Sequence, residues 1–218
     1  MSSPKSQNIS WHNPIITKED RERLLGQKGF TLWFTGLSRS GKSTLATELQ
    51  KRLHERDYIT FILDGDNIRH GLNTDLGFSP EDREENIRRM GEVAHLFSQA
   101  GIINMTAFIS PYRADRKKAR SLAKEGEFVE IFCRCSLEVC EQRDMKGVYK
   151  KARAGEIAEF TGISAPYEEP DDPEIIIDTD KESVDDSVQK VICFLERLEF
   201  IENRESSHRL SAVKSSIK

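Results

Sequence analysis

A chain of 218 residues that is 37% hydrophobic can bury a real core, and we expect a single domain. The formal net charge of −4 argues against a general nucleic-acid binder, because contacts with phosphates require a basic excess. No apolar run is long enough to cross a bilayer and no targeting signal is visible, so we expect a cytoplasmic protein without a membrane or nucleic-acid partner. The four cysteines, Cys133, Cys135, Cys140 and Cys193, show no metal-binding spacing, and we expect reduced residues of the core or of strands.

The chain begins with a polar N-terminal arm, residues 1–24. Thr17 followed by Asp20 resembles a helix cap, which predicts a short helix to about Leu25. Residues 30–35 are apolar and bounded by glycines, and they predict the first buried strand.

A phosphate-binding pattern follows this strand. Residues 36–44 read Gly36-Leu37-Ser38-Arg39-Ser40-Gly41-Lys42-Ser43-Thr44 and match G-x-x-x-x-G-K-[ST] at every fixed position. Its glycines let the backbone curl so that successive N–H groups point inward, and leucines at 45, 49 and 53 predict a helix directly after it, which adds the positive end of its dipole. In such a loop Lys42 reaches the β- and γ-phosphates and the Ser43 hydroxyl holds Mg²⁺. A chance turn is the alternative, but strand, loop and helix together predict a nucleoside triphosphate site.

The rest of the chain alternates strand-like and helix-like segments. Strands are predicted at 58–63, 102–109, 127–133 and 174–177, and helices at 79–101, 112–124, 137–143 and 184–198. This alternation predicts a P-loop NTPase-type three-layer α/β/α fold with a mainly parallel five-stranded sheet. Residues from about 145 to 165 break the rhythm, as is typical of a lid. Residues 201–218 are a polar tail, which we expect to be disordered.

Ligands of such sheets bind at the carboxyl ends of the strands, where several polar segments are expected. Asp64 and Asp66 follow the second strand, so one carboxylate can steer Mg²⁺ and the other can accept a proton from an attacking hydroxyl. An Asp-Gly turn with solvated side chains is the alternative, and the neighbouring phosphate loop favours a functional role. The segments 110–113 and 143–153 follow the next two strands, and we expect all of them to face one cleft.

Cationic and aromatic residues indicate the kind of acceptor. Arg69, Arg83 and Asn86 offer cation forks and an amide suited to an anionic substrate, although the last two also fit a surface helix with ion pairs. Phe78 and Phe160 lie in turn-rich segments, where stacking on a planar base is one explanation. Ordinary anchoring of the loops is the other, and the residues alone favour it. The residues therefore predict a small-molecule kinase with an anionic, aromatic acceptor.

Eight sequence blocks in order resemble one family. They are residues 36–44, 64–69, 76–79, 82–89, 108–113, 141–144, 146–155 and 159–167. Together, over about residues 8–200, they resemble the adenosine 5′-phosphosulfate (APS) kinases, also called adenylylsulfate kinases. The segment 162–167 is more similar to free-standing and fungal-type members than to animal bifunctional synthases.

The resemblance implies transfer of a phosphoryl group from ATP to the ribose 3′-hydroxyl of APS with Mg²⁺, giving PAPS and ADP, by a homodimer. Lys42, Asp64 and Ser110 would be catalytic, with Asp64 as the proton acceptor, and Ser43 and Asp66 would hold the metal. The implied ATP contacts are Gly36, Ser38, Arg39, Ser40, Gly41, Lys42, Ser43, Thr44 and Arg143. The implied APS contacts are Asp66, Asn67, Ile68, Arg69, Phe78, Arg83, Glu84, Glu85, Asn86, Ile109, Ser110, Lys146, Glu159 and Phe160. The two phenylalanines would sandwich the adenine, and residues 145–165 would close as a lid.

Two alternatives remain beside this reading. One is a catalytically weak regulatory module that binds APS or PAPS. The complete phosphate-loop sequence Gly41-Lys42-Ser43 argues against it. The other is a different small-molecule P-loop kinase, for gluconate or shikimate. The paired phenylalanines Phe78 and Phe160 argue against it. Arg39 stands where the family usually has a small residue, so it can change ATP affinity or add a phosphate contact.

Overall fold

Five strands form the central sheet of the computed structural model, which describes residues 9–10 and 12–202. They are β1 (Thr31–Thr35), β2 (Thr60–Asp64), β3 (Ile103–Ala107), β4 (Phe128–Arg134) and β5 (Ile175–Asp178), in the order β2-β3-β1-β4-β5. Every neighbouring pair is parallel, so all the strands end at the same edge. The predicted parallel sheet is confirmed, and each strand lies within two residues of its predicted bounds.

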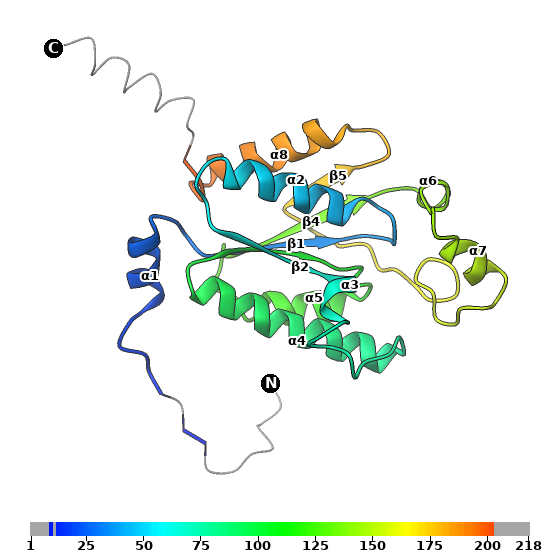
Figure 1. Ribbon diagram of the computed structural model, residues 1–218, viewed down its shortest axis with the longest axis horizontal. Helices are drawn as coiled ribbons and strands as arrows, with labels where there is room; N and C mark the ends of the chain where they lie inside the picture. Colours follow the sequence, from blue (N-terminus) through cyan, green and yellow to red (C-terminus); the bar gives the residue numbers. More distant parts are fainter. Residues whose placement is uncertain (1–8, 11, 203–218) are drawn as a thin grey trace, which may run out of the picture.

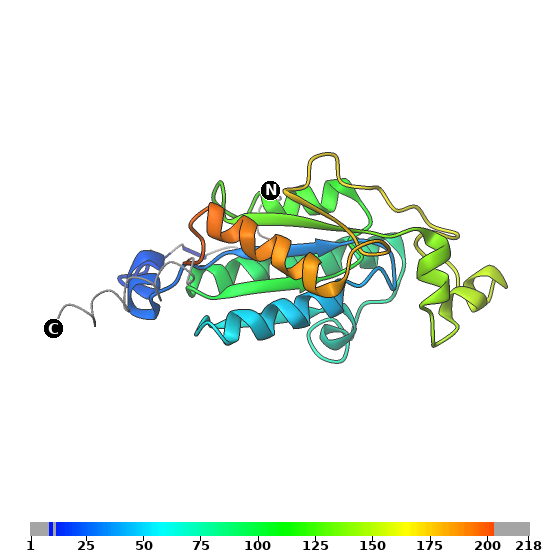
Figure 2. The ribbon, with the colours of Figure 1, turned by 90° about the horizontal axis from the view of Figure 1, so that it is seen from above.

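Helices cover both faces of this sheet (Figures 1 and 2). α2 (Lys42–His54) and α8 (Val184–Arg197) lie on one face, and α4 (Pro80–Gln99) and α5 (Arg113–Arg120) lie on the other. α1 (Lys18–Leu25) precedes β1, whereas α3 (Gly65–Ile68), α6 (Leu137–Gln142) and α7 (Val148–Arg153) lie beyond the carboxyl ends of the strands. The three-layer α/β/α fold is therefore confirmed. The sequence analysis missed α3 and α7, because so short a helix shows no periodicity.

Caps at the helix starts are those that the sequence predicted. The Thr17 hydroxyl accepts the Asp20 N–H at 3.2 Å, and the Asp20 carboxylate accepts the Thr17 N–H at 3.0 Å. At the start of α4, the Ser79 hydroxyl accepts the Asp82 N–H at 3.1 Å, and Pro80 occupies the first helical position. These contacts satisfy backbone donors that a helix start leaves unpaired.

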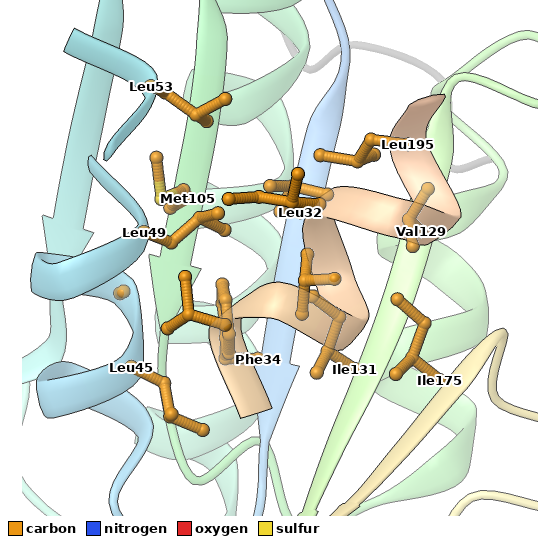
Figure 3. Close-up of a cluster of buried hydrophobic side chains, with 14 of the residues drawn as sticks. Leu32, Phe34, Leu45, Leu49, Leu53, Met105, Val129, Ile131, Ile175 and Leu195 are labelled. Carbon is orange, nitrogen blue, oxygen red and sulfur yellow. The ribbon is translucent and has the colours of Figure 1, made fainter. Parts of the chain in front are cut away.

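The larger core lies between the sheet and the layer of α2 and α8. Leu45, Leu49 and Leu53 recur every four residues, so they form one stripe on α2, and all three are buried. Figure 3 shows this stripe directed toward the sheet, where Leu32 and Phe34 of β1 lie. This packing fixes α2, and therefore the phosphate loop before it, against the carboxyl end of β1.

We expect Leu49→Ala to lower the free energy of unfolding by about 2–5 kcal/mol, the usual cost of emptying a fully packed leucine site. Leu49 is 1% exposed and lies in the middle of the stripe, so its neighbours cannot easily close the cavity. Chemical denaturation measures the change. Leu24→Ala is the control, because Leu24 is exposed and its truncation creates no cavity.

Three predictions need correction or restriction. Cys133 and Cys140 are buried and Cys135 is half-buried, but Cys193 is exposed on α8, so the expected core or strand position is wrong for Cys193. Ile201 is buried, and the Glu202 N–H donates to the Tyr58 hydroxyl at 2.8 Å, so the packed chain continues to residue 202. Residues 203–218 of the predicted tail, and residues 1–8 and 11 of the arm, lie outside the described residues. Within the described part of the chain, no helix is long and apolar enough to span a membrane.

Candidate active site

Two adjoining cavities lie at the carboxyl edge of the sheet. The first has a volume of about 510 Å³ and is lined by residues that follow β1, β2 and β3 and by the predicted lid. The second has a volume of about 480 Å³ and is lined from the phosphate loop, α6 and the segment after β5. Arg39, Lys42 and Ser43 line both cavities, and we call these three residues the junction. The sequence-predicted segments therefore meet, but around two cavities rather than one.

The phosphate loop between β1 and α2 depends on its glycines at two positions. A Cβ on Gly36 would lie 2.5 Å from the Cys133 carbonyl oxygen, so only glycine lets the loop pass this close to β4. Gly41 has a φ of 92° and stands directly before α2. That left-handed conformation costs glycine little and other residues more. Gly41 and Thr44 line the second cavity, whereas Gly36 and Ser40 line neither and support the loop.

The Lys42 ammonium lies inside this loop. It donates to the carbonyl oxygens of Leu37 at 2.6 Å and of Gly36 at 3.0 Å, and Lys42 is 8% exposed. Burial lowers the pKa of Lys42 to about 8. The junction therefore holds a partly desolvated cation, whose attraction to an anion is stronger than it would be in water.

Ser43, the third residue of the junction, contacts Asp64 of the first cavity. The Ser43 hydroxyl donates to Asp64 Oδ2 at 2.6 Å, while Asp64 Oδ1 accepts the N–H of Asp66 at 3.0 Å and starts α3. A hydroxyl beside a carboxylate is the oxygen donor set with which P-loop NTPases hold Mg²⁺. Asp66 is exposed and lines the first cavity, and within the described residues its carboxylate accepts no hydrogen bond.

Two arginines flank Phe78 in the first cavity. The guanidinium of Arg69 lies 4.4 Å from the centre of the Phe78 ring, and that of Arg83 lies 5.6 Å from it. Burial lowers the pKa of both guanidinium groups, which stay charged because the ordinary value is so high. Phe78 itself is 59% exposed, so most of its ring is open to a ligand. Asn86 also lines the cavity; its side chain accepts a hydrogen bond from Asn73 and donates none within the part of the chain that the structure describes.

The predicted lid contacts the phosphate loop directly. The Tyr149 hydroxyl of α7 donates to the Ser38 carbonyl at 2.8 Å. The ring of Phe160 meets the Tyr149 ring edge-on, with centroids 4.9 Å apart. Arg83 donates to the Glu159 carbonyl at 2.7 Å, which ties α4 to the same segment. Lys146 and Phe160 line the first cavity, so the predicted lid forms part of its wall.

Ser110 has a left-handed backbone, with a φ of 40°, and buried surroundings. The indole N–H of Trp33 donates to the Ser110 hydroxyl oxygen at 3.1 Å, and Arg116 donates to the Ser110 carbonyl at 2.6 Å. Thr35 donates to the carbonyl of Ile109 at 2.7 Å. The Ser110 oxygen is thus already an acceptor, and its own proton is available to a ligand in the first cavity. Sequence reasoning missed Trp33, Thr35 and Arg116, because no motif marks residues that support a site through hydrogen bonds to its lining residues.

Arg143, for which the resemblance implied an ATP contact, lines the second cavity. It donates to the Thr179 carbonyl at 2.6 Å and to the Thr179 hydroxyl at 3.3 Å. Thr179 also lines this cavity, and the sequence analysis missed it because it stands in an ordinary turn after β5.

Several predicted APS contacts line neither cavity. Glu84 forms an ion pair with Lys118, and Glu85 is paired with Arg88 and Arg89, whose hydrogen bonds lower its pKa to about 2. Ile68 packs against the smaller core on the α4 face. Asn67 and Glu159 also lie outside the cavity linings, and their backbone groups contact Asp64 and Arg83. These five side chains lie outside both cavity linings; ion pairs hold those of Glu84 and Glu85 elsewhere, and the smaller core holds that of Ile68.

Known proteins are similar to this chain in both sequence and fold. A family model described as adenylylsulphate kinase matches residues 28–178. The adenylyl-sulfate kinase of Staphylococcus carnosus is 59% identical over 192 residues, which cover 88% of this chain and 96% of the relative. The APS kinase CysC of Mycobacterium tuberculosis, solved with AMPPNP and APS, is 46% identical with a TM-score of 0.75, over 78% of this chain and 99% of that chain. The hexameric APS kinase of Thiobacillus denitrificans is 34% identical with a TM-score of 0.62, over 84% of this chain and 31% of that chain.

Proposed function

We propose that this chain, which belongs to the adenylylsulphate kinase family, transfers a phosphoryl group from ATP to the ribose 3′-hydroxyl of APS and releases PAPS and ADP. The observation that carries the proposal is the pair of cavities that meet at Arg39, Lys42 and Ser43. The second cavity would receive the adenosine of ATP, the junction its phosphates, and the first cavity APS. Phosphoryl transfer depends mainly on such positioning of two substrates in line.

Mg²⁺ fits the donor set at the junction. The Ser43 hydroxyl and the Asp64 carboxylate lie together at 2.6 Å, and Mg²⁺ is usually held by one or two carboxylates with substrate phosphates. The ion would neutralise negative charge on the transferring group. The sequence analysis gave the metal role to Ser43 and Asp66, and the contact with Ser43 supports adding Asp64 to this set.

Asp64 is also the proposed proton acceptor. Its carboxylate is held from both oxygens, by Ser43 and by the start of α3, and Asp64 lines the first cavity. A general base must lie within hydrogen-bond reach of the proton that it takes, and a fixed carboxylate keeps that reach constant. Asp66, in the same cavity, would help to place APS and the metal. Ser110 would donate a hydrogen bond to APS.

Phe78 and Phe160 would stack on the adenine of APS, with Arg69 and Arg83 as cations for its phosphosulfate. The Phe78 ring supports this arrangement because it lines the first cavity, is 59% exposed and lies beside two guanidinium groups. Asn86, Ile109 and Lys146 line the same cavity and are the remaining proposed contacts.

We expect Phe78→Ala and Phe160→Ala each to weaken APS binding by roughly tenfold to a hundredfold, since base–aromatic stacking is worth about 1–3 kcal/mol. The affinity for ATP should change little, because neither ring lines the second cavity. Isothermal titration with APS and with a non-hydrolysable ATP analogue measures both. Phe97→Ala is the control, since the Phe97 ring packs against the smaller core, stacks on Phe61 and lines neither cavity. Loss of ATP affinity in place of APS affinity would mean that the two nucleotide sites are exchanged.

A homodimer and a cytoplasmic location complete the proposal. The hexameric relative supports self-assembly within the family, and four free cysteines fit a reducing compartment. Analytical ultracentrifugation of the full chain should give twice the mass of 24.9 kDa.

The function is tested by measuring ADP release with APS and, separately, with gluconate, shikimate and related sugar acids. With ATP present, we expect ADP release with APS as the acceptor and none with the sugar acids. Turnover with a sugar acid, or none with APS, would contradict the proposed function.

A further inference from the structure

Arg39 is the one junction residue to which phosphate-loop chemistry gives no part. The phosphate-loop pattern accounts for Lys42 and Ser43, but it leaves the position of Arg39 open to any residue. Yet Arg39 lines both cavities, as those two do. Its backbone has a φ of 63°, a conformation that favours glycine over a residue with a long side chain. A cation is therefore held, against backbone preference, at the place where the two cavities meet.

The guanidinium of Arg39 is anchored from behind by Asp144. Arg39 Nε lies 3.6 Å from Asp144 Oδ1, and the Asp144 side chain is 2% exposed. Both atoms are buried, and neither has a hydrogen-bond partner among the described residues. The other Asp144 oxygen accepts the Tyr149 N–H of α7 at 2.7 Å, which fixes the carboxylate. This ion pair holds the inner nitrogen of the guanidinium.

The outer part of the Arg39 side chain remains available to a ligand. The side chain is 33% exposed, and neither terminal nitrogen donates a hydrogen bond within the described residues. A planar fork with free N–H groups matches the oxygens of a phosphoryl group. Anchoring at Nε reduces the rotamer entropy that a free arginine would lose on contact with a ligand.

We propose that Arg39 is a further catalytic residue, which contacts the phosphoryl group as it passes between the cavities, and that Asp144 is its positioning residue. The inference rests on the proposed function, because it takes both cavities as nucleotide sites. Charge on the equatorial oxygens of the transferring group is what an arginine supplied within the same chain stabilises. Lys42 and Arg39 would then provide two cations at the junction, one from the loop interior and one beside the lid.

Arg39→Gly is the variant that tests this role, since glycine accepts the left-handed backbone without strain. With both substrates saturating, we expect kcat to fall by about 10²-fold, the scale for removing one preorganised donor. The affinity for the ground-state analogue AMPPNP should stay within about threefold, while binding of ADP–aluminium fluoride in the presence of APS should weaken by nearly the factor lost from kcat. Added guanidinium should restore part of the activity.

Asp144→Asn separates positioning from contact. It keeps the acceptor for the Tyr149 N–H but removes the charge that holds Arg39, so we expect a smaller loss of kcat and no rescue by guanidinium. Arg23→Ala is the matched control, because Arg23 is an exposed arginine on α1 and, among the described residues, forms an ion pair with Asp20 alone. Thermal unfolding of each variant shows whether the fold is kept, and Arg39→Asn, which is uncharged and also tolerates a left-handed backbone, replaces Arg39→Gly if the latter is unstable, with the same expected loss of affinity for the aluminium fluoride complex.

Three results would overturn the role of Arg39. The first is an unchanged kcat of Arg39→Gly. The second is an AMPPNP affinity of Arg39→Gly that falls by as much as its kcat/KM. The third is equal affinity of the wild type and Arg39→Gly for ADP–aluminium fluoride in the presence of APS. The wild-type chain separates this failure from failure of the proposed function. If the wild type forms no PAPS, the function itself is wrong, whereas normal turnover by both proteins removes only the role of Arg39.

Discussion

Asp64→Asn is expected to lower kcat by about 10²–10⁴-fold, the usual range for a general acid–base group. The amide cannot accept a proton from the 3′-hydroxyl, yet its one oxygen can still accept the N–H groups that start α3, and its NH2 group can donate to the Ser43 hydroxyl. The fold and APS affinity should therefore stay close to those of the wild type. Single-turnover kinetics with both substrates saturating isolates the chemical step from binding.

Ser110→Ala provides the comparison for Asp64→Asn. The Trp33 indole already donates to the Ser110 oxygen, and a serine without an activating base is a weak nucleophile. We therefore expect Ser110→Ala to keep measurable turnover and to bind APS more weakly. A folded Ser110→Ala protein without activity, together with an active Asp64→Asn protein or ping-pong kinetics, would favour a phosphoserine route and refute direct transfer.

Lys42→Ala is expected to reduce kcat by about 10²–10³-fold, because the transferring group loses one preorganised cation. The Lys42 side chain is buried within the loop, so a circular dichroism spectrum and a thermal unfolding curve must show that the loop and α2 remain folded. Near-normal turnover of a folded Lys42→Ala protein would refute the assignment of the phosphate site.

The same lysine predicts how ATP binding depends on pH. Burial lowers the pKa of Lys42 to about 8, so the free protein loses this charge as the pH rises through that value. A triphosphate favours the charged form, and binding must then take up a proton. The Kd for ATP should therefore be constant below pH 8 and rise above it, approaching about tenfold per pH unit. Titrations from pH 7 to 9.5 measure this, and Lys42→Ala, which lacks the ammonium, should show no such rise.

Local signals predicted the strands and the phosphate loop, whereas many of the other residues that line the two cavities were implied by the resemblance to a family. Buried runs mark parallel strands, and a loop that needs glycine at Gly36 and Gly41 leaves a fixed spacing. Glu84 and Glu85 show where this reasoning ends. They lie beside Arg83 and Asn86 in a block that resembles a family motif, but their ion pairs with Lys118, Arg88 and Arg89 come from tertiary structure.

The supporting contacts of the site could not be predicted for the same reason. Trp33 looks like any apolar strand residue, and only the pairing of β1 with β3 brings its indole N–H to Ser110. The anchoring of Arg39 by Asp144 joins residues more than a hundred positions apart, and no local pattern records it. Division of the expected single cleft into two cavities likewise depends on where the phosphate loop crosses the edge of the sheet.

Direct identification of the product tests the central claim most directly. The purified full chain is incubated with ATP, Mg²⁺ and APS, and phosphorus NMR with ribose proton couplings locates the new phosphate. We predict one equivalent of ADP for each APS consumed and a phosphate on the ribose 3′-oxygen. Tight binding of APS or PAPS without any ADP release would instead make the chain a nucleotide-binding module, and phosphate at any other position would contradict the placement of the acceptor hydroxyl beside Asp64.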